Sequence, residues 1–277
     1  MKPQSLLFTI FGVYVRPYGN EIWVGSLTKL LGEFGMTEQA VRAAISRMLK
    51  QGWLKSRKVG NRSYYSMSER GKSRLYEAAS RIYKVDTVTW NKRWCIVSYS
   101  IPEERRHLRD EFRKELSYLG FGMLTNSTWI SPNELYDRVV EIVQAHGIQS
   151  YVEAFYADHL GWSNPKELVE KCWNLNEINE AYSRFIEKYK PLYERAAESF
   201  RRKETAYDDN RCFVEVTQLV HEYRKFLFID PDLPAELLPD RWLGTEADKL
   251  FKAYHDLLHP GALRFFDKVY EPVPMQS

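Results

Sequence analysis

The chain has 277 residues, of which 44% are hydrophobic and 28% charged, a balance that excludes intrinsic disorder and provides for two or three domain cores. Its three cysteines, Cys95, Cys172 and Cys212, are far apart and odd in number, which argues against a disulfide framework and a structural zinc site. We therefore expect a reducing, cytoplasmic location.

The formal net charge of +3 is unevenly distributed. Residues 1–85 contain 15 lysines and arginines against five acidic residues, so the remainder of the chain is net acidic. Such asymmetry indicates a polyanionic partner for the basic part, because neutralising phosphates releases condensed counterions. Charge alone leaves open a basic domain that is merely soluble.

The apolar run from Leu6 to Val15 predicts a buried helix at the start of a soluble domain. It follows a single lysine, no small-residue cleavage site comes after it, and it is too short to span a bilayer. We expect neither a secretion signal nor a membrane partner.

The next segments predict two helices joined by a tight turn. Ser26 is the expected N-cap of the first helix, Gly35 ends it, and Thr37 caps the second. A short glycine-containing turn between two amphipathic helices is typical of a helix-turn-helix.

Residues 38–51 predict the helix that carries the function. Its apolar residues recur on one arc, as a buried face requires: Val41, Ala44, Ile45, Met48 and Leu49. Arginine can bond guanine edges, glutamine can bond adenine, and alanine permits close approach to a major groove. The candidate DNA contacts on the other arc, together with the cap, are Thr37, Gln39, Arg42, Ala43, Ser46, Arg47 and Lys50. For an isolated helix, an ordinary solvated face would be the alternative interpretation.

Residues 53–58 and 62–67 predict two strands around the turn Gly60-Asn61, a two-residue hairpin signal that requires positive backbone φ angles. Beside a recognition helix this hairpin would be a wing, which favours DNA binding. Its candidate donors for phosphates or the minor groove are Lys55, Arg57, Lys58, Asn61 and Arg62. A further helix starts at Ser68, so residues 1–85 predict a winged helix-turn-helix domain.

Residues 86–161 predict a second domain of different character. Buried strands are expected at 93–102, 128–130 and 151–156, with amphipathic helices between them. This strand and helix alternation is typical of a ferredoxin-like α+β module, and such sheets often pair as dimers. We expect a dimerisation scaffold.

Residues 162–277 predict a mainly α-helical domain whose helices are separated at Pro191, Asp208-Asp209 and residues 230–234. A helix over 211–228 carries a polar stripe of Thr217, His221 and Arg224 that could face a pocket. A satisfied core pair is the alternative interpretation of His221 and Arg224.

No motif for catalysis or a cofactor is present in the sequence. Gly71-Lys72-Ser73 lacks the first glycine of a phosphate loop, because Ser66 occupies its position. His255 and His259 have metal-ligand spacing, but no glutamate follows His255 as in the metalloprotease pattern. We expect no enzyme activity, no metal and no cofactor.

Several segments together resemble the PaaX-type repressors of phenylacetate degradation along nearly the whole chain. They are Ser5-Leu6-Leu7 through Phe11-Gly12, Val41 through Met48, Gly52-Trp53-Leu54, Leu219 through Arg224, Asp230 through Pro234, Leu238-Pro239 and Trp242-Leu243-Gly244. The resemblance implies a homodimeric repressor of aromatic-acid catabolic genes that leaves its operator when phenylacetyl-coenzyme A binds. For this acyl-CoA effector we expect contacts from His221, Arg224, Arg211 and Trp242, with Arg202 as a weaker candidate for its phosphates.

The middle segment also resembles the small ferredoxin-like subunit of the CRISPR adaptation complex, some relatives of which are metal-dependent nucleases. Ser100 stands where their metal-binding carboxylate would end the first strand. A neutral hydroxyl is a poor sole ligand for a divalent cation, so we expect no nuclease activity. A nuclease and a constitutive architectural DNA-binding protein remain the alternative hypotheses.

Overall fold

The computed structural model describes residues 1–83, 89–204 and 206–272. Within them the chain is a mixed α+β protein with a three-stranded and a four-stranded sheet, both antiparallel. None of the described helices is both long and apolar enough to cross a membrane.

The chain divides into two compact units. Unit 1 comprises residues 1–84, 185–224 and 246–277, and unit 2 comprises residues 85–184 and 225–245. Segments from the C-terminal third therefore belong to unit 1 together with the N-terminal residues. The division of the sequence into three consecutive domains stays a prediction.

The N-terminal part of unit 1 contains four helices and a small sheet. Its elements in chain order are α1 (Pro3–Ile10), β1 (Glu21–Trp23), α2 (Val24–Gly32), α3 (Glu38–Lys50), β2 (Leu54–Val59), β3 (Arg62–Met67) and α4 (Glu69–Ile82). The strand order is β1-β3-β2, so the hairpin is widened by β1 along the β3 edge. This third strand has only three residues, too few for a clear alternating pattern, and the sequence did not predict it.

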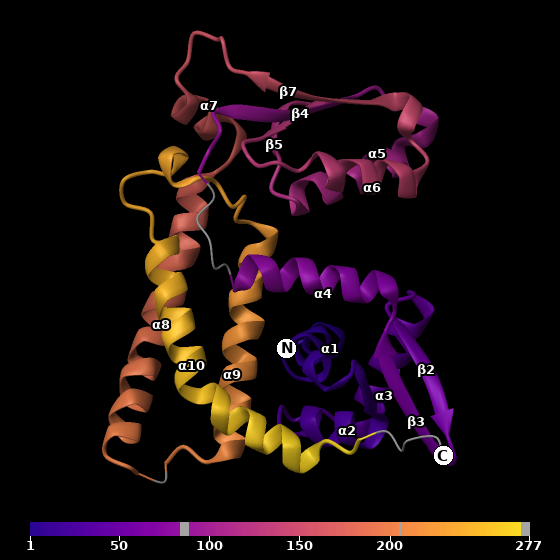
Figure 1. Ribbon diagram of the computed structural model, residues 1–277, viewed down its shortest axis with the longest axis vertical. Helices are drawn as coiled ribbons and strands as arrows, with labels where there is room; N and C mark the ends of the chain where they lie inside the picture. The colour runs from indigo at the N-terminus through magenta and orange to yellow at the C-terminus, as the bar shows by residue number, and fades with distance from the viewer. Residues whose placement is uncertain (84–88, 205, 273–277) are drawn as a thin grey trace. The chain divides into compact units, whose positions relative to one another are not determined.

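Long helices complete unit 1. They are α8 (Leu175–Arg201), whose first residues belong to unit 2, α9 (Asp209–Tyr223) and α10 (Gly244–Val269), which begins at the unit boundary. The apolar α1 lies between α3 and α9, as Figure 1 shows, and its Leu6, Leu7 and Ile10 are fully buried. The expected buried first helix is confirmed, and it continues as a π-helical turn over Phe11–Val15.

Ser26 and Pro191 of unit 1 lie within helices, whereas the sequence predicted helix boundaries there. The helix expected to start at Ser26 starts at Val24, and Ser26 is a buried residue inside it whose hydroxyl donates to the carbonyl of Val269 on α10. A tertiary acceptor, which no local pattern reveals, satisfies this hydroxyl. Pro191 was expected to separate two helices but lies inside α8, where Tyr189 and Ala196 on either side are buried. Packing of the flanking turns offsets the hydrogen bond that proline removes.

Unit 2 contains a four-stranded sheet with two helices on one face (Figure 1). Its elements are β4 (Arg93–Tyr99), α5 (Arg106–Tyr118), β5 (Gly122–Thr125), β6 (Thr128–Ser131), α6 (Tyr136–His146), β7 (Val152–Asp158) and α7 (Pro165–Cys172). The strand order is β5-β6-β4-β7. Alternate β4 residues Cys95, Val97 and Tyr99 enter a core with Phe112 of α5 and Val139 of α6. Strand β5 was missed because it is short and largely exposed.

The boundaries in the C-terminal third agree in part with the sequence. Asp208 caps α9 by accepting from the amide of Arg211, which confirms the break at Asp208-Asp209. The helix expected over 211–228 ends at Tyr223 and continues as 3₁₀ structure over Arg224–Phe228. An irregular segment follows it, as expected for residues 230–234.

Candidate nucleic-acid interface

Helices α2 and α3 are joined by a short turn in which Gly35 has a φ of +72°, a conformation that glycine adopts without strain. Thr37 caps α3, since its hydroxyl oxygen accepts from the amide of Ala40 at 3.2 Å. Four residues of the predicted inner arc of α3 are buried, namely Val41, Ala44, Ile45 and Met48, whereas Leu49 near the end of the helix is half-buried. This burial fixes the rotation of α3 and so decides which residues face outward.

The outer arc of α3 is exposed at every position proposed for DNA contact, namely Gln39, Arg42, Ala43, Ser46, Arg47 and Lys50. The Arg42 guanidinium donates to Glu38 at 2.7 Å, one turn earlier, so Glu38 orients this arginine in the free protein. Within the described residues, no carboxylate forms an ion pair with Arg47 or Lys50. These two cations are available to a polyanion without breaking an internal pair.

The hairpin of β2 and β3 turns at Gly60 and Asn61, between the paired residues Val59 and Arg62. Gly60 has a φ of +56°, but Asn61 does not have a positive φ, so the expectation of two positive dihedrals is wrong for the second residue. All five proposed donors on the hairpin are exposed, namely Lys55, Arg57, Lys58, Asn61 and Arg62.

The hairpin has one arginine on each strand, Arg57 on β2 and Arg62 on β3, and each of them is paired with a carboxylate. Arg57 donates to both carboxylate oxygens of Glu21 on β1, at 3.0 and 2.6 Å. Arg62 pairs with Glu271, which follows α10, and its guanidinium lies 4.4 Å from the ring centre of Trp23. These hydrogen bonds raise the pKa of both arginines above the ordinary value. Among the described residues, Lys55 and Lys58 form no such pair.

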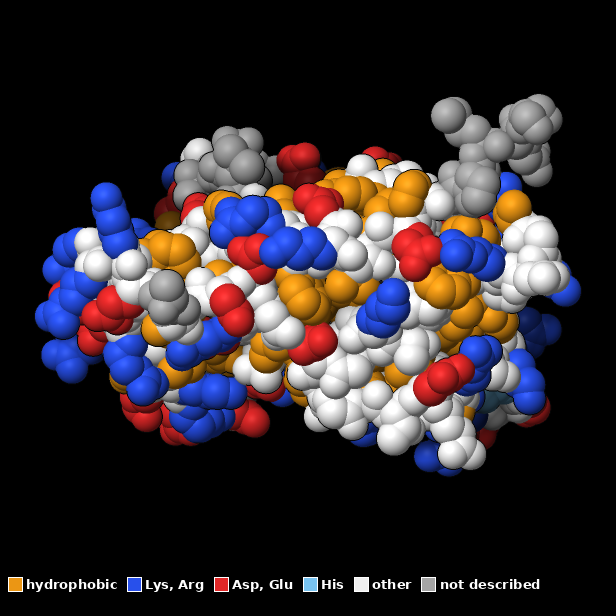
Figure 2. Space-filling view, turned by 90° about the horizontal axis from the view of Figure 1, so that it is seen from below, with side chains coloured by type: hydrophobic (Ala, Val, Ile, Leu, Met, Phe, Trp, Pro, Cys, Tyr) orange, Lys and Arg blue, Asp and Glu red, His pale blue; other side chains and the backbone are white. Residues whose placement is uncertain are grey.

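Sequence reasoning missed Glu21, Trp23, Lys29 and Glu271 as neighbours of the candidate interface. Glu271 is separated from Arg62 by 209 residues, and no local pattern connects them. Figure 2 shows lysine and arginine side chains interspersed with acidic ones on the face it displays. The positive charge of residues 1–85 is therefore moderated locally by carboxylates, one of them from the far end of the chain.

The polar stripe of α9 faces α1. His221 is 4% exposed, and its Nδ1 lies 3.1 Å from the hydroxyl of Thr9. Arg224, which directly follows α9, donates to the carbonyl of Ser5 on α1 at 2.9 Å. One turn before His221 on α9, the hydroxyl of Thr217 lies 3.2 Å from the hydroxyl of Tyr14. The polar stripe of α9 and the residue that follows it therefore meet polar groups of the N-terminal segment, namely Ser5, Thr9 and Tyr14.

The other effector candidates lie apart from this stripe. Arg211 is exposed and donates to Glu215 at 2.7 Å, and Arg202 is exposed and donates to Glu198 at 2.6 Å. Trp242 belongs to unit 2, where it packs edge-on against Tyr182, whereas the other four candidates belong to unit 1. No single described cavity within one unit contains all five.

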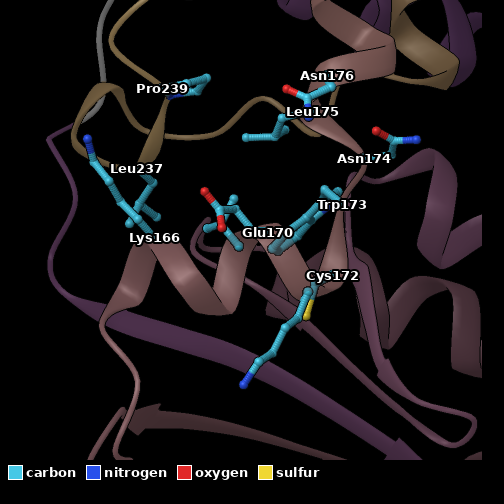
Figure 3. Close-up of a pocket in the computed structure, with 11 residues that line it drawn as sticks. Lys166, Glu170, Cys172, Trp173, Asn174, Leu175, Asn176, Leu237 and Pro239 are labelled. Carbon is cyan, nitrogen blue, oxygen red and sulfur yellow. The ribbon is translucent and has the colours of Figure 1, made fainter.

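A surface hollow of about 500 Å³ lies in unit 2, beside α7 and the segment that follows it (Figure 3). Its lining comprises Lys166, Val169, Glu170, Lys171, Cys172, Trp173, Asn174, Leu175, Asn176, Leu237 and Pro239. None of the five effector candidates lines it. No ligand site was predicted from the sequence in this region.

Among the described residues, no three histidine, cysteine or acidic side chains lie together so that they could hold a metal ion. The rings of His255 and His259 stack with their centres 4.5 Å apart on α10. Ser100 follows β4 at the predicted place and is exposed, with its amide donating to the carbonyl of Tyr151 at 2.8 Å.

Three family models together match most of the chain. A PaaX-like protein model covers residues 2–71, the PaaX protein central Cas2-like domain covers residues 87–169, and the PaaX-like protein C-terminal domain covers residues 173–268.

Two proteins are similar along nearly the full length. The transcriptional repressor PaaX of Escherichia coli (strain K12) is 33% identical over 264 residues, which cover 94% of this chain and 82% of the relative. The structure of the uncharacterized protein Rv0674 from Mycobacterium tuberculosis shares the fold with a TM-score of 0.55 and 24% identity, over 94% of this chain and 96% of that one. The chain belongs to the family of PaaX-type transcriptional repressors.

Proposed function

We propose that the protein is a cytoplasmic, DNA-binding repressor of phenylacetate catabolic genes, with α2, α3 and the β2–β3 hairpin acting as a winged helix-turn-helix. The observation that carries this proposal is that every proposed contact residue on the outer arc of α3 is exposed, while Val41, Ala44, Ile45 and Met48 on the inner arc are buried. The similarity to a transcriptional repressor supports the same function.

Arg47 provides the sharpest test because no internal carboxylate competes for it among the described residues. Replacing Arg47 with alanine is expected to weaken binding to a selected operator duplex by about 1–3 kcal/mol if the side chain reaches a base edge. Arg195 on α8, which is equally a surface arginine, serves as the matched control. Equal affinities of the Arg47→Ala protein, the Arg195→Ala protein and the wild type would refute the placement.

The same titration separates a repressor from an architectural protein. A repressor prefers its operator to competitor DNA of mixed sequence, whereas an architectural protein binds both alike. Incubation of the protein with DNA and manganese distinguishes a nuclease, for which the neutral Ser100 is unfavourable.

Unit 2 supports the proposal of a ferredoxin-like dimerisation domain. The proposal is supported by the sheet order β5-β6-β4-β7 with antiparallel neighbours and by the packing of α5 and α6 on one face, because a ferredoxin-like βαββαβ module would have these features. A homodimer would present two α3 helices to successive major grooves of a pseudo-palindromic operator. Sedimentation of the full chain with and without operator duplex measures this stoichiometry.

The proposed effector is an acyl-CoA, with phenylacetyl-CoA as the first candidate and His221, Arg224, Arg211, Trp242 and Arg202 as the proposed contacts. The ligand must bind the free protein more tightly than the operator-bound protein, because only a difference in affinity shifts the equilibrium. Calorimetry with phenylacetyl-CoA measures the binding, and its addition to the operator complex measures release. Unchanged ligand affinity after substitution of both His221 and Arg224 would move the pocket elsewhere.

A further inference from the structure

The carboxylate of Glu271 lies on the candidate DNA surface although it belongs to the end of the chain. One of its oxygens faces Nζ of Lys29 on α2 at 3.8 Å, and the other faces Nη1 of Arg62 on β3 at 2.5 Å. The Lys29 and Arg62 side chains are 61% and 47% exposed, so both cations remain open to solvent beside the carboxylate. A single anion thus bridges a helix and a strand of the proposed winged helix-turn-helix.

The main chain places Glu271 there independently of its charge. Its amide donates to Oγ of the fully buried Ser26 at 3.3 Å, and that hydroxyl donates to the carbonyl of Val269 at 2.8 Å. The phenol of the preceding Tyr270 donates to the carbonyls of Tyr18 and Glu21, at 3.1 and 3.2 Å. These contacts connect the end of α10 to the start of α2 and to β1.

Arg62 likewise has a second support. Its guanidinium lies 4.4 Å from the centre of the Trp23 ring, a cation–π arrangement that keeps the arginine on this surface without any carboxylate. A carboxylate is therefore not required to hold either Arg62 or the end of α10 in place. The carboxylate of Glu271 does, however, partly neutralise Lys29 and Arg62, two cations that a phosphate could also bind.

We propose that Lys29 and Arg62 form a binding site for a phosphate of the DNA backbone and that Glu271 occupies this site in the free protein as an internal competitor. A lysine ammonium and an arginine guanidinium that face the two oxygens of one anion are a donor set that also suits the anionic oxygens of a phosphodiester group. The carboxylate must yield or rearrange when the phosphate arrives, so it lowers DNA affinity. This inference rests on the proposed DNA-binding function.

The energies involved favour replacement of the Glu271 carboxylate by a DNA phosphate. Exposed ion pairs contribute little to stability, so the internal pair is easily broken. A duplex phosphate brings the release of condensed counterions, which an isolated carboxylate does not. Glu271 therefore acts on affinity and on salt dependence while leaving the fold intact.

Glu271→Gln tests the proposal, because the amide keeps the size of the side chain and removes its charge. Binding of this variant to a fluorescent duplex, selected by the wild type from a random pool, is expected to be about 3- to 10-fold tighter. The logarithmic salt slope is expected to steepen by up to about one, because Lys29 and Arg62 no longer share their positive charge with a carboxylate when they meet the phosphate.

Glu198→Gln is the matched control. Glu198 on α8 is also paired with two cations, Arg201 at 2.8 Å and Arg202 at 2.6 Å, and the substitution changes the net charge equally. A similar gain in affinity for both variants would mean a general charge effect and would overturn the proposal. Unchanged or weaker binding by Glu271→Gln, with an unchanged thermal unfolding temperature, would overturn it as well.

The double variant Glu271→Gln with Arg62→Ala tests whether the tighter DNA binding of Glu271→Gln depends on Arg62. If the phosphate site is the one described, the tightening caused by Glu271→Gln disappears in the Arg62→Ala background, and persistence of the full gain would contradict the assignment. Failure of the proposed function gives a different result, since the Arg47→Ala protein would then bind like the wild type. The two failures are therefore distinguishable in one set of titrations.

Discussion

Thr9 on α1 and His221 on α9 are 212 residues apart in the sequence, yet the hydroxyl of Thr9 lies 3.1 Å from Nδ1 of His221 in the interior of unit 1. Both side chains are nearly inaccessible, at 2% and 4% exposure. A polar group buried in this way destabilises the protein unless it is hydrogen-bonded. The pair therefore contributes a specific polar contact between α9 and the first helix of the chain.

Removal of one partner is expected to destabilise unit 1. Thr9→Val and His221→Ala should each lower the free energy of unfolding by about 1–3 kcal/mol, because each removes the hydrogen bond between Thr9 and His221 from the interior. Urea denaturation of both single variants and the double variant measures the coupling, expected at about 0.5–3 kcal/mol. His107→Ala, at an exposed position on α5, is the control, and additive effects of Thr9 and His221 would argue against the bond.

Lys58 on β2 tests the contribution of the hairpin to DNA affinity. It is exposed and forms no ion pair among the described residues, so its ammonium group can meet a phosphate directly. Lys58→Ala is expected to reduce the logarithmic salt slope of DNA binding by about one, with little change in sequence preference. Lys190→Ala, an exposed lysine on α8, should leave the slope unchanged. A wild-type slope for Lys58→Ala would exclude a phosphate contact at this position.

Substitution of Gly120 and of Gly147 by alanine distinguishes the effect of backbone strain from that of steric conflict in unit 2. Both have positive φ angles, +91° and +62°, but a Cβ on Gly120 would lie 2.5 Å from the carbonyl oxygen of Pro231, whereas nothing surrounds one on Gly147. Gly147→Ala is expected to cost about 1–2 kcal/mol from strain alone. Gly120→Ala should cost more, because Pro231 must also move. Equal losses in thermal unfolding would contradict this packing.

Acid should destabilise the protein through His259 on α10. Burial, with a smaller contribution from the neighbouring His255, lowers the pKa of His259 from 6.5 to about 4. Between these values the unfolded chain binds a proton that the folded protein does not, so stability is complete above pH 6.5 and declines as the pH falls toward 4. The loss should be on the order of 2 kcal/mol, since solvent screens part of the shift.

Chemical denaturation at several pH values checks this linkage. His259→Gln should retain more of its stability at pH 5 relative to pH 7 than the wild type does, because it cannot take up the proton. The exposed His107 provides the matched substitution, His107→Gln, which should follow the wild type. Identical pH dependence of the His259→Gln protein and the wild type would assign the acid sensitivity to other groups.

The sequence by itself determined the elements whose apolar residues repeat with a clear period. The helix over 38–51 is an example, since Val41, Ala44, Ile45 and Met48 can be buried together only if Arg42 and Arg47 point outward. The hairpin followed from its turn and strand residues, and the buried strand β4 from its apolar run. These features depend on interactions between residues close in the chain.

Only the tertiary structure decided which distant segments meet. The burial of Ser26 against α10, the continuity of α8 through Pro191 and the pairing of Arg62 with Glu271 each depend on a partner far away in the sequence. The stripe around His221 had two interpretations in the sequence, and contact with α1 gives it core partners. A side chain's periodicity predicts that it is buried or exposed, but the partner it meets depends on how separate elements pack, which no local pattern encodes.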